Sequence, residues 1–284
     1  MLRVGAHCST AGGVENAVAE AVDLGCDALQ IFARGPRAWQ SNPLRASQIA
    51  AFREARRQAK LQPVVIHASY LINLASAEES VRRQSVEAFT DEVRRGVMLG
   101  ADYLVFHPGS AKNQSVEEAI ERLADSLAEV KSDVAWDGLT VLFENSAGSG
   151  ASLGRNFDEL AAMRQAVLDR IEAPLGFCLD TAHLFAAGFD IRCEQGLEET
   201  LRAASKKLGL SRVPVIHAND SKTKLGSKVD RHEQIGKGHI GAEAFERILR
   251  HPKLRRKAFV LETPRDGDGS HRANVEALRS LSAG

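Results

Sequence analysis

The chain has no excess of charge of either sign. Its 284 residues include 37 Lys and Arg and 37 Asp and Glu, so the formal net charge is zero. A strong global positive field, which drives non-specific binding to nucleic acid, is therefore excluded. A polyanionic partner would have to be attracted by a local patch or by bound metal.

Long apolar runs and paired cysteines are also missing. No segment approaches the ~18 apolar residues of a membrane helix, and the N-terminal MLRVGAHCSTAGG has no apolar core of a secretory signal. No CxxC pair is present among the four cysteines Cys8, Cys26, Cys178 and Cys193. We therefore expect a cytoplasmic protein with reduced thiols, no disulfide framework and no membrane association.

Short apolar runs alternate with longer amphipathic segments along the whole chain. The apolar runs predict eight strands, at 2–7, 28–33, 63–68, 103–108, 140–145, 175–180, 213–218 and 258–263. The intervening segments predict helices at 15–25, 46–60, 78–100, 115–134, 156–171, 198–209, 242–250 and 272–281. The strands are rich in Val, Ile, Leu and Phe and do not alternate with polar residues, which is typical of parallel strands covered on both faces.

Eight strand–helix units in strict alternation predict an α/β fold, a closed (β/α)8 TIM barrel. An open doubly wound sheet is the alternative architecture. Because no linker-like or low-complexity segment interrupts the pattern, we assign residues 1–284 to a single barrel domain.

Ionisable residues end the apolar runs. Seven of the eight predicted strands finish in His, Asp or Glu, namely His7, His67, His107, Glu144, Asp180, His217 and Glu262. In a barrel these C-terminal ends meet on one face, where active sites lie. A single such residue is usually a satisfied polar group, but seven at one register are hard to explain by chance. Imidazole and carboxylate together are the ligand set of zinc or a similar divalent metal.

Two short motifs extend this set. DTAH places His183 three residues after Asp180, and DRH places Asp230 and His232 in the longest irregular stretch, 219–241. An irregular stretch of that length is more often functional than idle. The candidate metal ligands are then His67, His107, Glu144, Asp180, His183, His217, Asp230, His232 and Glu262. Nine ligands exceed the need of one or two ions at roughly three to four each, so three ions with one bridging carboxylate are predicted. Three divalent ions outweigh four carboxylates, and such a site favours phosphate-ester hydrolysis.

At these residues the sequence resembles the endonuclease IV family, zinc-dependent endonucleases of abasic DNA sites. The motifs that carry the resemblance are GAHCSTAGG, HASYLINLA, FHPGS, LFEN, CLDTAHLFAAGFD, HANDSK, VDRHEQIGKGHIG and LETP, which span nearly the whole chain. The family implies the same barrel and three zinc ions. The first zinc would be bound by His67, His107 and Glu144, the second by Glu144, Asp180, His217 and Glu262, and the third by His183, Asp230 and His232. Glu144 would be the catalytic residue, bridging two ions and holding the metal-activated hydroxide.

The resemblance also implies a substrate. It would be double-stranded DNA containing abasic sites or blocked 3′ ends, cut by a monomer on the 5′ side of the abasic sugar to leave a 3′-hydroxyl and a 5′-deoxyribose phosphate. By position, Arg37, Tyr70 and Leu71 would insert where the base is missing, because unstacking is cheapest at a damaged site. Arg231, beside two ligands, is a candidate phosphate contact.

The remaining predictions are local. His7 is a candidate to support the metals or face a phosphate, and Trp39 is expected to pack under the Arg37 loop. Three histidines, His239, His251 and His271, are expected on the surface. Family members often carry His after HPGS, where this chain has Ala111, which puts one local substrate contact in doubt.

Two other functions remain open from the residues alone. A sugar isomerase or epimerase on a similar barrel would need one or two metals and would leave Asp230 and His232 unexplained. A DNA-damage binding module with structural metal would be expected to have a closed, cysteine-rich site. No cysteine joins the candidate cluster, so hydrolysis is the favoured interpretation.

Overall fold

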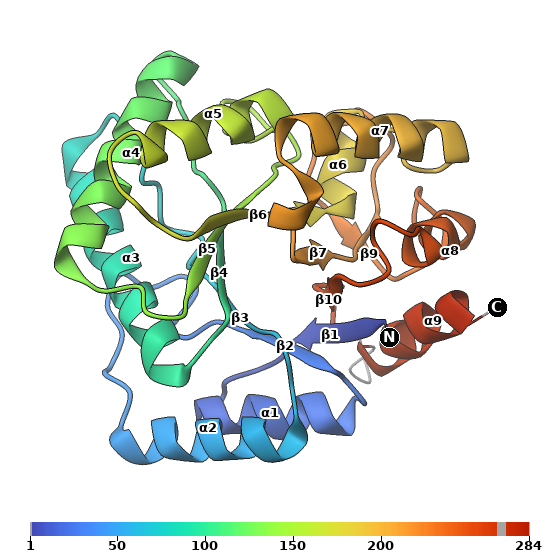
Figure 1. The fold of residues 1–284 in the computed structure, drawn as a ribbon, viewed down its shortest axis with the longest axis horizontal. Helices are drawn as coiled ribbons and strands as arrows, with labels where there is room; N and C mark the ends of the chain where they lie inside the picture. The colour runs from blue at the N-terminus through green and yellow to red at the C-terminus, as the bar shows by residue number, and fades with distance from the viewer. Residues whose placement is uncertain (1, 266–270, 284) are drawn as a thin grey trace.

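A closed barrel of eight parallel strands forms the centre of the molecule (Figure 1). The structure, a computed structural model, describes residues 2–265 and 271–283. The barrel strands are β1 (Arg3–His7), β2 (Ala28–Ile31), β3 (Val64–His67), β4 (Tyr103–Phe106), β5 (Thr140–Glu144), β6 (Leu175–Asp180), β7 (Val215–His217) and β10 (Ala258–Leu261). The first and last of them pair in parallel and close the ring. This closure confirms the predicted TIM barrel and excludes the open sheet.

Helices surround the barrel and follow the predicted segments closely (Figure 1). They are α1 (Val14–Asp23), α2 (Ala46–Ala59), α3 (Glu79–Leu99), α4 (Val116–Asp133), α5 (Phe157–Leu168), α6 (Thr181–Ala187), α7 (Glu194–Lys207), α8 (Ala242–Arg250) and α9 (His271–Ala283), with a short 3₁₀ turn at Leu210–Arg212. Helix α6 is an addition to the predicted set, and Asp180 caps it by accepting a hydrogen bond from the backbone N–H of His183. None of the helices described is long and apolar enough to cross a membrane.

Side chains alternate across the strands and separate two cores. Phe106, Phe143 and Phe177, on neighbouring strands, pack with ring-centroid distances of 5.2 and 6.2 Å in the core shared with the helices. The inner core of the barrel consists of Val65, Val105, Leu142, Cys178, Val215 and Val260. Because successive strand residues face opposite sides, every second residue from this inner core points inward again.

That alternation builds a ring of polar side chains at the C-terminal end of the barrel. Two residues beyond the six inner-core positions come His67, His107, Glu144, Asp180, His217 and Glu262. His7 and Gln30, which are paired in register between β1 and β2, complete the ring. We call these eight residues the rim layer. Its polar side chains therefore share one level of the barrel because the strand period places them there.

Some local predictions need correction. The stretch 219–241 is not wholly irregular, because β8 (Asp220–Ser221) and β9 (His232–Glu233) pair antiparallel within it. His271 is buried rather than on the surface, with its Nδ1 3.2 Å from the Thr263 hydroxyl. His251 is half-buried and lies 2.7 Å from a carboxylate oxygen of Glu198.

Other local predictions are confirmed. His239 is exposed, and all four cysteines are free thiols.

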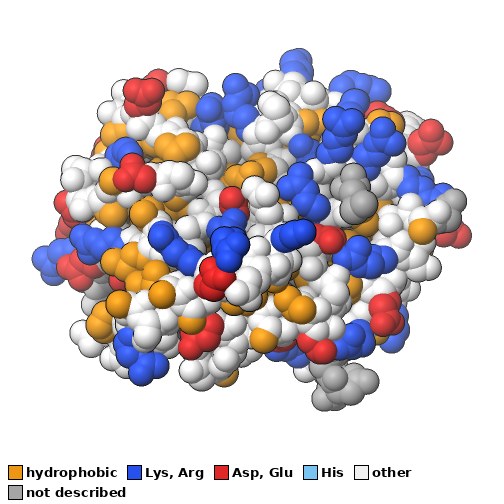
Figure 2. Space-filling view, turned by 60° about the horizontal axis from the view of Figure 1, so that its bottom comes forward, with side chains coloured by type: hydrophobic (Ala, Val, Ile, Leu, Met, Phe, Trp, Pro, Cys, Tyr) orange, Lys and Arg blue, Asp and Glu red, His pale blue; other side chains and the backbone are white. Residues whose placement is uncertain are grey.

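The balanced net charge does not mean an even surface, because the face in Figure 2 shows more Lys and Arg side chains than Asp and Glu. A local positive surface of this kind can attract a polyanion in the absence of a global field.

Candidate metal centre

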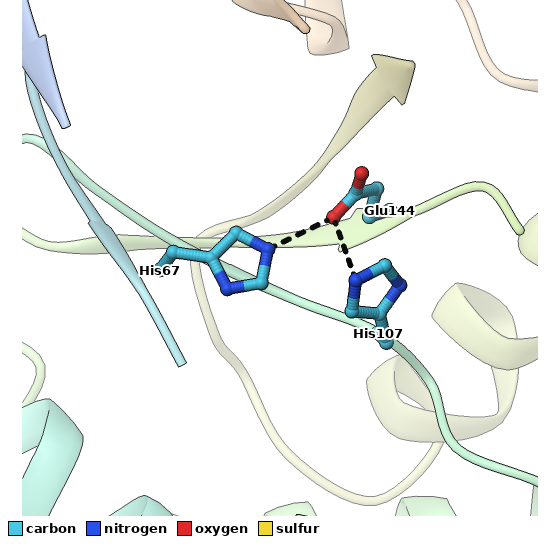
Figure 3. Close-up of side chains that lie close together, drawn as sticks. All are labelled: His67, His107 and Glu144. Carbon is cyan, nitrogen blue, oxygen red and sulfur yellow. Dashed lines mark hydrogen bonds and ion pairs between the residues drawn. The ribbon is translucent and has the colours of Figure 1, made fainter. Parts of the chain in front are cut away.

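One buried carboxylate lies at the centre of the site. Oε2 of Glu144 is 3.3 Å from Nε2 of His67 and 3.6 Å from Nε2 of His107 (Figure 3). Its second oxygen, Oε1, is 3.0 Å from Nδ1 of His217 and 3.4 Å from Nδ1 of His183. Glu144 is fully buried. Its two oxygens thus face two different sets of imidazoles, which is the arrangement that a bridging metal ligand requires.

Three groups of residues bring potential ligand atoms within 4.8 Å of one another. They are His67, His107 and Glu144; Glu144, Asp180, His217 and Glu262; and Asp180, His183 and His232. The first two are the groups that the family resemblance implies. In the third, Asp180 takes the place expected for Asp230, while the Asp230 carboxylate lies 3.1 Å from His183 Nε2 and 3.3 Å from His232 Nε2. All nine predicted ligands therefore lie in one cluster of side chains.

Four of the five candidate ligand histidines have one ring nitrogen bound to a carbonyl oxygen. Nδ1 of His67, His183 and His232 donates to the backbone carbonyls of Ala68, Asn145 and Glu262 at 2.8, 2.8 and 3.2 Å, and Nε2 of His217 donates to Oε1 of Gln30 at 2.8 Å. A carbonyl oxygen can only accept, so each bond leaves the opposite nitrogen free for a metal. Metal-ligating histidines almost always show this pattern.

Two buried ring nitrogens without hydrogen-bond partners in the described part of the chain indicate whether the site fits a cation. Nε2 of His183 and Nε2 of His232 are buried and have no hydrogen-bond partner of good geometry among the described residues. Buried polar atoms are normally satisfied, so both atoms need an explanation. Both lie close to the carboxylate of Asp230. A divalent cation held between them would satisfy all three groups, and the imidazole and carboxylate donor set suits it.

The electrostatics of the site favour added positive charge. Although burial lowers the pKa of His67 and His232, neighbouring carboxylates raise both to about 9. Burial opposes charge on Glu144 as well, but the charges of His107 and His217 hold its pKa well below the usual range. Protons and a metal ion would therefore compete for the same nitrogens, so acidification should weaken metal binding.

Tyr70 lies beside two of the candidate ligand histidines, His67 and His107. It is 57% exposed, yet its ring centroid is 5.8 Å from that of His67 and 5.3 Å from that of Phe32. A cavity of about 280 Å³ opens beside it and reaches His107 and Asp230. A substrate group entering this cavity would meet the ligand cluster directly, with an aromatic ring at its edge.

The two loops predicted to contact DNA adjoin one another. The carbonyl of Pro36 accepts hydrogen bonds from the Ser69 hydroxyl at 2.9 Å and from the Tyr70 N–H at 3.1 Å. Arg37 is exposed at the next position, and Leu71 is half-buried. The structure therefore brings the loops of Arg37, Tyr70 and Leu71 together, and of these three residues Tyr70 lines the cavity beside His107 and Asp230.

Buried charged side chains hold these loops, namely Arg34, which lies three residues beyond β2, and two residues of α3. Arg34 donates to the backbone carbonyls of Ala88 and Trp39 at 2.9 and 2.6 Å, and Arg95 donates to those of Ala33 and Asn42 at 3.1 and 2.8 Å. Trp39 packs against the core, as predicted. Glu92, a fully buried residue of α3, accepts a hydrogen bond from the Ser69 N–H at 3.1 Å. Burial raises the pKa of Glu92 to about 8.

The other candidate residues also lie at this face. Arg231 is exposed and its guanidinium bonds to the carbonyl of Asp230, so it stands at the edge of the ligand cluster. His7 has its Nδ1 3.1 Å from Nε2 of Gln30 and 3.9 Å from a carboxylate oxygen of Glu262. The burial of His7 lowers its pKa.

Sequence reasoning missed two buried polar residues here. Gln30 fills the rim position on the one strand without an ionisable end, and Asp220 accepts five backbone hydrogen bonds within the stretch 219–241. The period of two along ALQI, counted back from the expected rim level, could have identified Gln30. Nothing local marks Asp220, since its partners lie up to 21 residues further along the chain.

The fold and the site define a class of barrel whose polar rim offers candidate metal ligands. A sequence model of the family described as xylose isomerase-like TIM barrel matches residues 18–282. A Solibacter usitatus protein named "Probable endonuclease 4" is 48% identical over 280 residues, covering 99% of this chain and 97% of that protein. The crystal structure of endonuclease IV from Thermus thermophilus superposes with a TM-score of 0.86 at 38% identity, covering 98% of each chain. Within the class of xylose isomerase-like barrels, the chain belongs to the endonuclease IV family.

A more distant neighbour shows how widely the barrel is shared. A D-tagatose 3-epimerase-like protein superposes with a TM-score of 0.71 at 22% identity, covering 99% of this chain. At that identity the similarity concerns the fold alone. The barrel by itself therefore does not distinguish nuclease from epimerase chemistry, and the site residues must do so.

Proposed function

We propose that the protein hydrolyses the phosphodiester on the 5′ side of an abasic site in duplex DNA through a trinuclear zinc centre, as a step of DNA repair. Membership of the endonuclease IV family makes it a nuclease, and thus a hydrolase. The products would be a 3′-hydroxyl and a 5′-deoxyribose phosphate, and blocked 3′ ends would be trimmed at the same centre. The acting unit would be a monomer whose residues 1–284 form one barrel domain.

The observation that carries this proposal is the position of Glu144 between four imidazoles. Its oxygens would bridge a first zinc, held with His67 and His107, and a second, held with Asp180, His217 and Glu262. The third zinc would be held by His183, Asp230 and His232. Bound zinc ions would supply an activated water and neutralise the charge that develops on the phosphoryl group.

The chain itself orients the ligands and the substrate. Carbonyl groups fix the ring orientation of the ligand histidines, so little reorganisation is needed when ions bind. Arg231, exposed beside Asp230, would contact a phosphate. Tyr70 and Leu71 would fill the gap left by the missing base while Arg37, a flat cation on the adjoining loop, supports the opened stack.

Metal analysis combined with a nicking assay tests the central claim. We expect close to three zinc ions per chain and cleavage of an end-labelled duplex at a single abasic analogue, leaving an end that a polymerase extends. Glu144→Gln should keep the fold, as seen by circular dichroism, and lose at least about 100-fold in rate because the bridging charge is gone.

Other outcomes separate the alternatives. One or two ions with no nicking would favour a sugar isomerase or epimerase, and tight binding without strand scission would favour a binding module. Near-normal nicking by Glu144→Gln would contradict the role given to this carboxylate.

The DNA-contact residues are tested separately from the metals. Tyr70→Ala should weaken binding of the abasic duplex about 10-fold, because stacking of an aromatic side chain contributes ~1–3 kcal/mol, and should leave zinc content unchanged. Val22→Ala is the matched control, since Val22 is an exposed apolar side chain (54%) on α1. Equal affinities of the two variants would remove Tyr70 from the contact surface.

A further inference from the structure

Gln30 is the one rim-layer residue with no ionisable group, and it contacts three of the others. Its side chain is fully buried at the mouth of the barrel. Nε2 lies 2.5 Å from Oε1 of Glu262 and 3.1 Å from Nδ1 of His7, and Oε1 lies 2.8 Å from Nε2 of His217. A buried amide can thus satisfy most of its hydrogen-bonding capacity without any partner outside the rim layer.

The partners determine how the amide is oriented. A carboxylate only accepts hydrogen bonds, so the amide nitrogen must face Glu262 and the amide oxygen must face His217. Since that oxygen accepts, the proton of the His217 ring must be on Nε2. The lone pair of His217 is then on Nδ1, which points to Glu144 at 3.0 Å and to Glu262 at 3.4 Å. The nitrogen that faces the carboxylates is therefore selected by Gln30.

This selection distinguishes His217 from the other histidines of the centre. His67, His183 and His232 donate to backbone carbonyls, which no substitution removes. For His217 the acceptor is a side chain, from a strand on another part of the barrel. One substitution at position 30 can therefore change the tautomer of His217 without altering the tautomers of His67, His183 and His232.

We propose that Gln30 is a positioning residue of the metal centre, which holds His217 with Nδ1 toward the cation and aligns the Glu262 carboxylate for the same cation. The inference rests on the proposed function insofar as it requires a cation between Glu144, His217 and Glu262. It assigns no contact between Gln30 and the cation or the DNA. Loss of Gln30 should weaken one ion of the centre and leave those that do not use His217 nearly unchanged.

Three variants separate the two contacts of the amide. Gln30→Met is similar in size and removes both hydrogen bonds. Gln30→Glu keeps an acceptor for His217 but loses the donor to Glu262. Leu29→Met is the matched control on the same strand, because Leu29 is equally buried and lies in the core outside the rim layer.

The measurements are zinc retention against a competing chelator and the ¹⁵N signals of the His217 ring in zinc-loaded protein. For Gln30→Met we expect one ion to bind about 10–100-fold more weakly, as is usual when a partner of a metal ligand is lost, and His217 to lose its single tautomer. Gln30→Glu should retain the Nε2-protonated tautomer. Leu29→Met should match the wild type in both measurements.

Two results would overturn the inference. In the first, Gln30→Met retains every ion as tightly as Leu29→Met and shows the wild-type His217 tautomer. In the second, Gln30→Glu loses the Nε2-protonated tautomer of His217, as Gln30→Met does. This result would contradict the role of residue 30 as hydrogen-bond acceptor, even if Gln30→Met folds poorly. Abasic nicking by wild type alongside either result would sink the role of Gln30 only. A wild type that retains no zinc would sink the metal centre as well.

Discussion

The rim layer and the two loops at the same end of the barrel, 34–42 and 219–241, are built differently. Rim residues are placed by strands that pair in register all round the barrel, so their direction follows from the backbone. The loop 34–42 contains no strand, and the loop 219–241 has only the short β8–β9 pair, which is not part of the barrel. Each is held by buried charged side chains that bond to its backbone groups, Arg34 and Arg95 for the first and Asp220 for the second. The strand ends are therefore robust to single substitutions, whereas each loop depends on one or two residues.

The largest effect is expected at Asp220. Its carboxylate accepts from the backbone N–H groups of Ser221, Gly236, Gly238, Ile240 and Gly241 at 2.7–3.2 Å. Asp220→Asn turns an NH₂ group toward N–H donors and should lower the free energy of unfolding by about 3 kcal/mol. Because β9 carries His232, zinc content should fall as well. Urea unfolding and metal analysis measure both.

A surface aspartate provides the control for that change. Asp158→Asn alters an exposed carboxylate on α5 that pairs only with Lys207 among the described residues. It should change stability by less than about 0.5 kcal/mol. An equally small effect of Asp220→Asn would show that this loop is not organised by its buried carboxylate.

A smaller effect is expected at Arg34. Arg34→Met leaves the carbonyls of Ala88 and Trp39 without their donor, which should cost about 2 kcal/mol of stability. Since the Arg37 loop loosens, the Kd for an abasic duplex should rise several-fold while zinc content stays constant. Arg83→Met, at an exposed position of α3, is the matched control. If Arg34→Met changed the zinc content but not the Kd, Arg34 would support the metal ligands of the rim layer rather than the DNA-contact loop.

The smallest effect is expected at His271, a buried residue that bonds to Thr263 just beyond β10. Burial lowers its pKa to about 4, compared with 6.5 for a free side chain, so the folded protein holds it neutral. This contribution is fully present above pH 6.5 and is lost as the pH falls toward 4, because only the unfolded chain takes up the proton.

Urea unfolding at pH 7.5 and pH 5 measures this contribution. The wild type should lose about 1–2 kcal/mol more than His271→Asn between the two values. Parallel losses in the two proteins would show that His271 titrates alike in the folded and unfolded chain.

The sequence allowed the barrel and the ligand cluster to be predicted because both follow from one regularity. Continuous apolar runs end in a polar residue at the same level of the barrel, and Glu144 and His217 needed no more than that. Gln30 was missed because its strand was expected to run to residue 33, whereas β2 ends at Ile31. The strand end was therefore expected two residues further along the chain than it is, and Gln30 was not considered as a rim residue.

The loop anchors could not be predicted in the same way. Arg34 bonds to Ala88, 54 residues away, and Asp220 to Gly241, 21 residues away. Such bonds depend on where the folded backbone passes, and no local pattern of residues specifies them. His271 shows the same limit, because a polar residue at the start of a helix is normally exposed, whereas here it is buried and bonds to Thr263, two residues beyond β10.

The pairing of β10 with β1 has a consequence for biosynthesis. Glu262 follows the last strand of the barrel, while its neighbours His7 and Gln30 come from the first two. A growing chain therefore cannot present the complete ligand set until its final strand has been made and docked beside the first. If the cluster binds metal as proposed, fragments that lack β10 should bind it more weakly than chains in which the barrel has closed.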